Sequence, residues 1–124
     1  MPPLGLRSSK IPISMSDANS LRTAISERTV VADGAMGTML QAQNPTLEDF
    51  GGHEGCNEFL NKTRPDIVAN VHRAYLETGV DAVETNTFGA NFSNLSDYGI
   101  EAMIYELAKL GAQIARSECD KFST

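Results

Sequence analysis

Two short segments of the chain place acidic and small polar residues directly after apolar, β-prone runs. In residues 30–38, Val-Val-Ala leads into Asp33-Gly34-Ala35-Met36-Gly37-Thr38. In residues 82–91, Ala-Val leads into Glu84-Thr85-Asn86-Thr87-Phe88-Gly89. In parallel α/β proteins, ligands bind in the turns that follow the carboxyl ends of strands. These two segments are therefore the first candidates for a binding site.

The first segment has the composition of a cradle for a small anion. Gly34 and Gly37 let backbone N–H groups converge, and a helix beginning here adds partial positive charge. No lysine follows the second glycine, and a GxGxxG pattern is absent, so a nucleotide phosphate loop is not indicated. A carboxylate in the cradle and an ammonium group beside Asp33 would together describe an amino-acid ligand. A plain strand-to-helix turn is the alternative.

The second segment places four polar side chains at the mouth of the expected second strand, those of Glu84, Thr85, Asn86 and Thr87. A carboxylate in this position of an α/β fold is a functional candidate, although it could equally cap the next turn. Other titratable residues give weaker signals. His53, Glu54 and Cys56 are too crowded for a structural zinc site, and His72 is expected to lie at the helix surface or to be satisfied by hydrogen bonds.

Hydrophobic periodicity predicts alternating helices and strands. The predicted elements are a helix of about ten residues capped by Ser16 or Asp17, strands at 29–33 and 80–85, a short helix at 38–43, and longer helices starting at Pro65 and Glu101. Residues 44–64 and 86–99 are expected to be loops, and Gly79 should end the helix that Pro65 begins. The order αβαβα predicts the α/β class with parallel strands.

Composition and net charge argue against several classes of function. The chain has 124 residues and a formal net charge of −6, which argues against nucleic acid as a partner. No apolar run is long enough to span a membrane. Only two cysteines are present, so reduced thiols in a cytoplasmic protein are expected. Residues 1–16 are predicted to be a disordered tail preceding a domain at 17–124.

Four motifs together resemble the homocysteine-binding (homocysteine S-methyltransferase) domain of the cobalamin-dependent methionine synthases. They are Asp33-Gly34-Ala35-Met36-Gly37-Thr38, Gly55-Cys56-Asn57-Glu58, Thr63-Arg64-Pro65-Asp66, and residues 84–91. The resemblance covers about residues 20–120 in the family's order and spacing. It implies the first βα units of a (βα)8 TIM barrel, incomplete in this chain because it stops before a third strand.

The resemblance also implies a reaction and a set of binding residues. The reaction is methyl transfer to the zinc-activated thiolate of homocysteine, giving methionine, with zinc and cobalamin as the cofactors of the full-length family. Asp33 and the backbone of Gly34 and Ala35 would hold the amino-acid portion of homocysteine. Asn86, Thr87 and Phe88 would line the same site. Glu84 is included partly because of its position at the end of the expected second strand.

Zinc ligands are missing from the motifs, because Cys56 and Cys119 do not correspond to the family's three zinc cysteines. The chain is therefore expected to be a fragment that is inactive alone, lacking the methyl-donor domains of the full enzyme. One alternative is a non-catalytic interaction module that self-associates through an open strand edge. Others are a fragment of a betaine- or S-methylmethionine-dependent homocysteine methyltransferase, and an unrelated barrel enzyme that binds a small anion.

Overall fold

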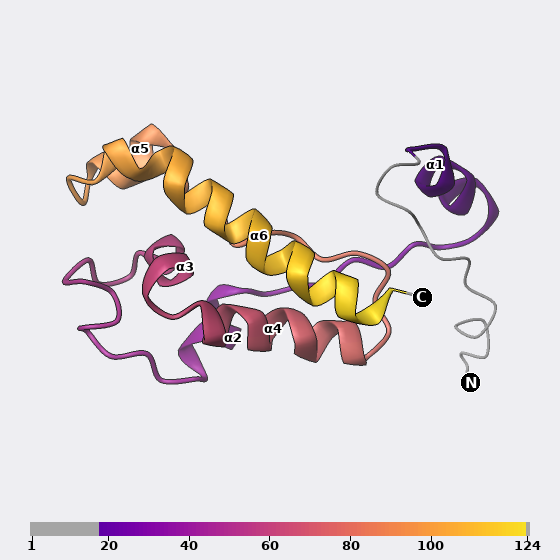
Figure 1. Ribbon diagram of the computed structural model, residues 1–124, viewed down its shortest axis with the longest axis horizontal. Coiled ribbons are helices and arrows are strands. Elements are labelled where there is room, and N and C mark those ends of the chain that lie inside the picture. The colour runs from indigo at the N-terminus through magenta and orange to yellow at the C-terminus, as the bar shows by residue number, and fades with distance from the viewer. Residues whose placement is uncertain (1–17, 124) are drawn as a thin grey trace.

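The computed structural model describes residues 18–123, and most of these residues are helical. The elements are α1 (Ala18–Glu27), α2 (Gly37–Gln41), η2 (Asn57–Phe59), α3 (Leu60–Thr63), α4 (Pro65–Glu77), α5 (Phe92–Ser96), η3 (Glu101–Met103) and α6 (Ile104–Phe122). Figure 1 shows α4 and α6 packed together, two extended segments beside them, and α1 apart from the other helices. The predicted disordered tail lies outside the described residues.

The two expected strands do not form a sheet. In residues 18–123 their pairing is limited to one isolated parallel bridge, between Ala32 and Ala82. The predicted α/β class, with the first βα units of a (βα)8 barrel, is therefore wrong for this structure. The described part of the chain is helical, and its two apolar runs are extended connections between helices.

Aspartate side chains explain why the pairing stops after one bridge. The Asp33 N–H donates to the Ala82 carbonyl at 3.0 Å, and the Asp81 N–H donates to the Val31 carbonyl at 2.8 Å. Beyond these bonds, the Val31 N–H donates to Asp81 Oδ2 at 2.9 Å, and the Glu84 N–H donates to the Asp33 carboxylate at 3.1 Å. Side-chain oxygens thus replace the carbonyls of a ladder, and two isolated strands are too few for a stable sheet.

Helix α4 confirms the sequence prediction at both ends. Pro65 is its first residue, where a missing N–H costs nothing, and Gly79 follows the C-cap with φ of 96°. Its buried face carries Ile67, Val68 and Val71, each at most 2% exposed. Each such side chain contributes about 1.5–3 kcal/mol of hydrophobic stabilisation when removed from water.

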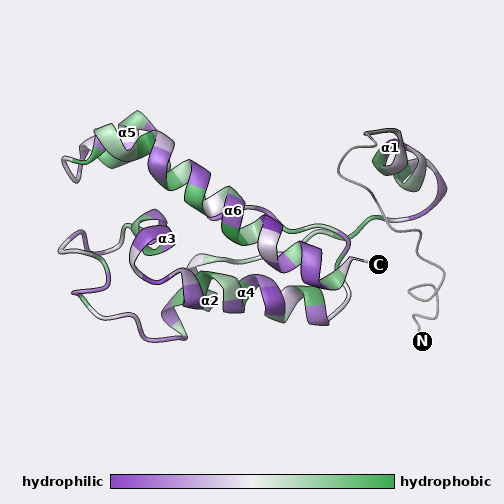
Figure 2. Ribbon diagram, viewed as in Figure 1, coloured by the Kyte–Doolittle hydropathy of each residue, from purple (hydrophilic) through white to green (hydrophobic). Residues whose placement is uncertain are grey.

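Two small apolar clusters hold the helices together. The first joins the buried face of α4 to Leu40 of α2, Phe50 and Leu60. The second joins Leu107 of α6 to Leu95 of α5 and Cys56. Figure 2 shows hydrophobic and hydrophilic residues interspersed along α6, as expected when one face of a helix packs against the core.

Other predicted elements agree with the structure only in part. Part of the expected loop at 86–99 is α5, whose N-cap Asn91 accepts a hydrogen bond from the Asn94 N–H at 2.8 Å. The predicted helix at 101–121 is present as η3 followed by α6. On α1, Ala24 is buried, while Leu21 and Ile25 of the same expected face are exposed. No helix in residues 18–123 is both long and apolar enough to cross a membrane.

Asp81 is expected to stabilise the start of the second extended segment. Its side chain is fully buried, and its Oδ2 lies 3.1 Å from Arg28 Nη1 as well as bonding the Val31 N–H. Asp81→Asn removes the charge that pairs with Arg28, so the free energy of unfolding should fall by about 2 kcal/mol. Urea titration followed by circular dichroism measures this change.

The exposed Asp97 provides a matched control for this substitution. Asp97→Asn should change the free energy of unfolding by no more than about 0.5 kcal/mol. Equal effects of the two substitutions would contradict the role given to Asp81.

Candidate functional site

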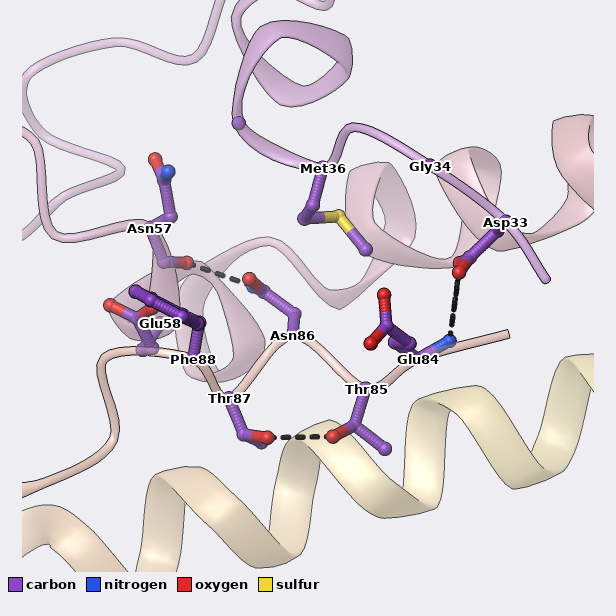
Figure 3. Close-up of a pocket in the computed structure, with 11 residues that line it drawn as sticks. Asp33, Gly34, Met36, Asn57, Glu58, Glu84, Thr85, Asn86, Thr87 and Phe88 are labelled. Carbon is purple, nitrogen blue, oxygen red and sulfur yellow. Dashed lines mark hydrogen bonds between the residues drawn. The ribbon is translucent and has the colours of Figure 1, made fainter. Parts of the chain in front are cut away.

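A cavity of about 470 Å³ lies between the two sequence motifs that were singled out first. Its walls are formed by Asp33, Gly34, Met36, Gly37, Asn57, Glu58, Glu84, Thr85, Asn86, Thr87 and Phe88. Figure 3 shows these residues arriving from three parts of the chain: the turn before α2, the η2 segment, and the extended segment after residue 83. The fold therefore brings together motifs that are distant in sequence.

Most of the predicted binding residues lie on the cavity wall, namely Asp33, Gly34, Glu84, Asn86, Thr87 and Phe88. Ala35 is outside the lining, and its carbonyl accepts a hydrogen bond from the Tyr75 hydroxyl at 2.8 Å. That bond ties the first turn to α4. The role of all seven residues in substrate binding stays a prediction.

The turn after Asp33 leaves hydrogen-bond donors available. Within the described residues, the N–H groups of Gly34 and Ala35 donate to no protein acceptor. Gly34 is exposed, so a ligand can approach its backbone. Free adjacent N–H groups can bind the oxygens of a small anion such as a carboxylate.

Asp33 is both an anchor and a charged part of the wall. Burial raises the pKa of its carboxyl above the ordinary value; the Glu84 N–H bond opposes this, and the Glu84 charge adds to it. Figure 3 shows the Asp33 carboxylate directed at the Glu84 backbone. The two carboxylates are thus held near each other, where a ligand cation would relieve their repulsion.

Side chains alternate along the second extended segment. Figure 3 shows Glu84 and Asn86 directed toward Met36, whereas Thr85 and Thr87 lie on the α6 side. The hydroxyl oxygens of Thr85 and Thr87 are 2.6 Å apart and hydrogen-bonded to each other. Thr87 therefore contributes to the wall with its hydroxyl already engaged.

A buried amide network fixes Asn86. Its Nδ2 donates to Asn61 Oδ1 and to the Asn57 carbonyl, both at 3.0 Å. Asn61 Nδ2 donates in turn to the Asn86 carbonyl at 2.9 Å and to the Leu107 carbonyl at 3.1 Å. With Asn61 1% and Asn86 4% exposed, this network holds one cavity wall against α3 and α6.

The electrostatic character of the cavity is acidic. Three carboxylates, those of Asp33, Glu58 and Glu84, belong to its lining, and no lysine, arginine or histidine does. A cationic group of a ligand is therefore favoured inside, and an anionic group needs the backbone donors of the first turn.

The environment of His72 differs from the prediction. It is fully buried on α4, and neither ring nitrogen has a hydrogen-bond partner in the described structure. The expectation of a surface or satisfied histidine was therefore wrong. Its position next to Val71 placed it at the edge of an apolar stripe, and helix packing turned that edge inward. Burial lowers the pKa of His72, and the charges of Asp33 and Glu118 partly oppose the shift.

The residues described here do not fit a zinc site. No group of three or more His, Cys, Asp or Glu residues in 18–123 is arranged to hold a metal ion. Both cysteines are free thiols; Cys56 is buried, and burial raises its pKa. His53 packs edge-on against the rings of Phe59 and Tyr98. We therefore assign no metal ligand in this part of the chain.

Sequence reasoning assigned no role to two residues of the wall, Asn57 and Glu58. Both lie in η2, within the stretch expected to be a loop. The Gly55-Cys56-Asn57-Glu58 motif is the signal that could have identified them. It contributed to the family resemblance, but it was given no chemical role. Its geometry shows that this motif supplies the wall opposite Asp33 (Figure 3).

Known proteins with similar sequences identify the family of this chain. Residues 30–124 match the homocysteine S-methyltransferase family, and the chain belongs to that family. Among its relatives is the methionine synthase of Mycobacterium tuberculosis, 55% identical over 104 residues, which are 84% of this chain and 9% of that protein. The methionine synthase of Mycobacterium leprae is 53% identical over 108 residues, 87% of this chain and 9% of that protein. The resemblance seen in the sequence is confirmed, and the chain spans 9% of the length of these relatives.

Gly111 of α6 is expected to tolerate no side chain, because α6 approaches the site closely there. A Cβ atom at this position would lie 2.8 Å from both Asn61 Nδ2 and Thr87 Cγ2. Gly111→Ala should therefore lower the free energy of unfolding by about 1–3 kcal/mol, although alanine gains about 1 kcal/mol in helix propensity. Urea titration measures the net effect.

A substitution at the exposed neighbour Ala112 measures the effect of helix propensity alone. Ala112→Gly should cost about 1 kcal/mol, with no change in the Asn86 side-chain amide signals. A stabilising Gly111→Ala substitution would show that the helix has room at this position.

The buried His72 should make stability depend on pH near neutrality. Because its pKa in the folded chain is below the ordinary value of 6.5, the unfolded chain binds more protons between the two values. Stability should therefore fall as the pH is lowered through 6.5, and be restored above it. Urea unfolding at pH 5.5 and 7.5 tests this expectation.

His72→Leu should abolish this pH dependence between about 5.5 and 7.5, because the titrating group is gone. His53→Gln retains His72 and should retain the dependence. A slope that persists in His72→Leu would assign the effect to another group.

Proposed function

We propose that this chain forms the homocysteine-binding part of a homocysteine S-methyltransferase of the methionine synthase type. The observation that carries the proposal is the acidic cavity at whose edge, within the described residues, the N–H groups of Gly34 and its neighbour Ala35 donate to no protein acceptor. An amino acid has the matching pair of charges, one anionic and one cationic. Membership of the family supplies homocysteine as the amino acid.

Each part of homocysteine has a complementary group. Its carboxylate would accept hydrogen bonds from the backbone N–H groups of Gly34, on the wall, and of Ala35, next to it, and these donors offset the acidic lining. Its ammonium group would lie beside Asp33 and Glu84, where it would lower the energy of two neighbouring carboxylates. Phe88, 99% exposed, would cover the apolar methylene chain.

Methyl transfer additionally requires the thiol to lose its proton. A free thiol with a pKa of about 8.5 is mostly protonated at neutral pH, and zinc in this family would supply the deprotonation. The described residues of this chain assemble no zinc site, so we assign binding and orientation to them and no step of the chemistry. We expect no methyl transfer by this chain alone. The cobalamin requirement, the contacts with methyl-donor domains and the cytoplasmic location stay predictions.

Homocysteine binding is tested by isothermal titration calorimetry on the reduced chain. L-Homocysteine should bind more tightly than 4-mercaptobutyrate, which lacks the ammonium group, and more tightly than 3-mercaptopropylamine, which lacks the carboxylate. Asp33→Asn should weaken homocysteine binding about tenfold, since a charge-assisted contact is lost while the amide oxygen can still accept the Glu84 N–H.

The affinity for 4-mercaptobutyrate should not fall in Asp33→Asn, because this analogue has no ammonium group. Asp97→Asn, outside the cavity, should leave both affinities unchanged. Absence of homocysteine binding, or equal affinities for all three ligands, would contradict the proposed function.

A further inference from the structure

Glu58 is a buried carboxylate that the proposed binding scheme does not use. It is 7% exposed, and no lysine or arginine in the described residues forms an ion pair with it. Its Oε2 accepts the Gly89 N–H at 2.8 Å, and its Oε1 lies 3.9 Å from the Cys56 thiol. Burying a carboxylate with so few partners is costly, which points to a specific use of its hydrogen bond.

The peptide units before and after Gly89 are each held by a side-chain hydrogen bond. Its N–H is bound by Glu58, and its carbonyl accepts a hydrogen bond from Asn94 Nδ2 at 2.9 Å. A Cβ atom on Gly89 would lie 2.5 Å from Asn94 Nδ2 and 2.9 Å from Glu58 Oε2. A side chain at position 89 would therefore displace Asn94 or Glu58 from its hydrogen bond to the Gly89 backbone.

Phe88 immediately precedes Gly89, and its ring is exposed. Its side chain is 99% exposed although the residue lines the cavity. Figure 3 shows Phe88 beside Glu58, on the wall opposite Asp33. Because the ring itself is unsupported, its place at the cavity depends on the backbone that carries it. That backbone is held by the Glu58–Gly89 hydrogen bond at 2.8 Å, together with the bond from Asn94 to the Gly89 carbonyl and a longer one of 3.3 Å from Asn91 Nδ2 to the Phe88 carbonyl.

We propose that Glu58 is a positioning residue, whose hydrogen bond to the Gly89 N–H holds Phe88 at the cavity so that its ring covers the apolar part of the bound amino acid. This inference rests on the proposed function, since homocysteine is the ligand that Phe88 covers. The role needs an acceptor oxygen at the right distance and does not need the negative charge. In that respect it differs from a direct ion pair between Glu58 and the ligand's ammonium group.

Two substitutions at Glu58 separate the two roles. Glu58→Gln keeps the length of the side chain and an acceptor oxygen but removes the charge. Glu58→Asp keeps the charge but is one methylene shorter, so its carboxylate no longer reaches the Gly89 N–H. A positioning role predicts that Glu58→Gln resembles the unmodified chain and that Glu58→Asp does not. A direct charge contact predicts the reverse order.

The first readout is independent of any ligand. In ¹⁵N-labelled chain, the Gly89 amide should exchange with solvent at least about tenfold faster in Glu58→Asp and at an unchanged rate in Glu58→Gln. Exchange of the α4 amides serves as the control for folding and should be the same in all variants. An unchanged Gly89 exchange rate in Glu58→Asp would overturn the proposal.

The second readout is the affinity for L-homocysteine by calorimetry. It should fall about tenfold in Glu58→Asp and less than about threefold in Glu58→Gln. Glu54→Gln, an exposed residue of the preceding loop, is the matched control and should change neither readout. A loss in Glu58→Gln as large as in Glu58→Asp would overturn the positioning role. If the unmodified chain binds no homocysteine, the proposed function fails, while Gly89 exchange still decides whether Glu58 fixes the turn.

Discussion

One buried side chain, Asn61, connects α3, the second extended segment and α6 beside the cavity. From α3 its amide donates to the carbonyls of Asn86 and Leu107 and accepts from the Asn86 side chain. Replacing it by an apolar residue would leave these carbonyls without the donor that they share, and each buried unsatisfied group costs about 1–3 kcal/mol. The glycine at position 111 serves the same junction, because it lets α6 come close enough for these bonds to form. The cavity wall is thus fixed by polar contacts that only close helix packing permits.

The charge of the cavity explains why backbone groups matter in it. With three carboxylates in the lining, the side chains favour cations and disfavour a ligand carboxylate. The N–H groups of Gly34 and Ala35 add donors without adding a competing ion pair. A zwitterionic ligand can therefore be oriented by two different kinds of group, side-chain charge at one end and backbone dipoles at the other.

Sequence reasoning succeeded where local chemistry decides the structure. Pro65 and Gly79 mark the ends of α4 because a fixed φ and a positive φ are properties of those residues themselves. The motifs that meet at the cavity were also identified, since an acidic residue followed by a glycine-containing turn is a local pattern. Their resemblance to a known family was confirmed by the family match, whereas homocysteine as the ligand stays a proposal.

The failures concern partners that are distant in sequence. The apolar β-branched runs at 29–33 and 80–85 predict strands, but a stable strand needs neighbouring strands to pair with. In the described residues, these two runs pair with each other through one bridge. The burial of His72 depends on how α4 packs, and the role of Glu58 depends on Gly89, 31 residues away. Nothing in the local sequence of either residue reports these contacts.

The sparse pairing of the two extended segments also affects how the site moves. Val31 and Asp81 are 50 residues apart, so each contact between these segments closes a long loop and costs conformational entropy. The helices α2 to α4 lie within that loop and are held by their own apolar cluster. Breaking a few hydrogen bonds can therefore part the cavity walls while the helical core remains folded, as in the local openings of other proteins. The candidate site lies at a junction closed by one bridge and a few hydrogen bonds, and a ligand that contacts both walls would add a connection between them.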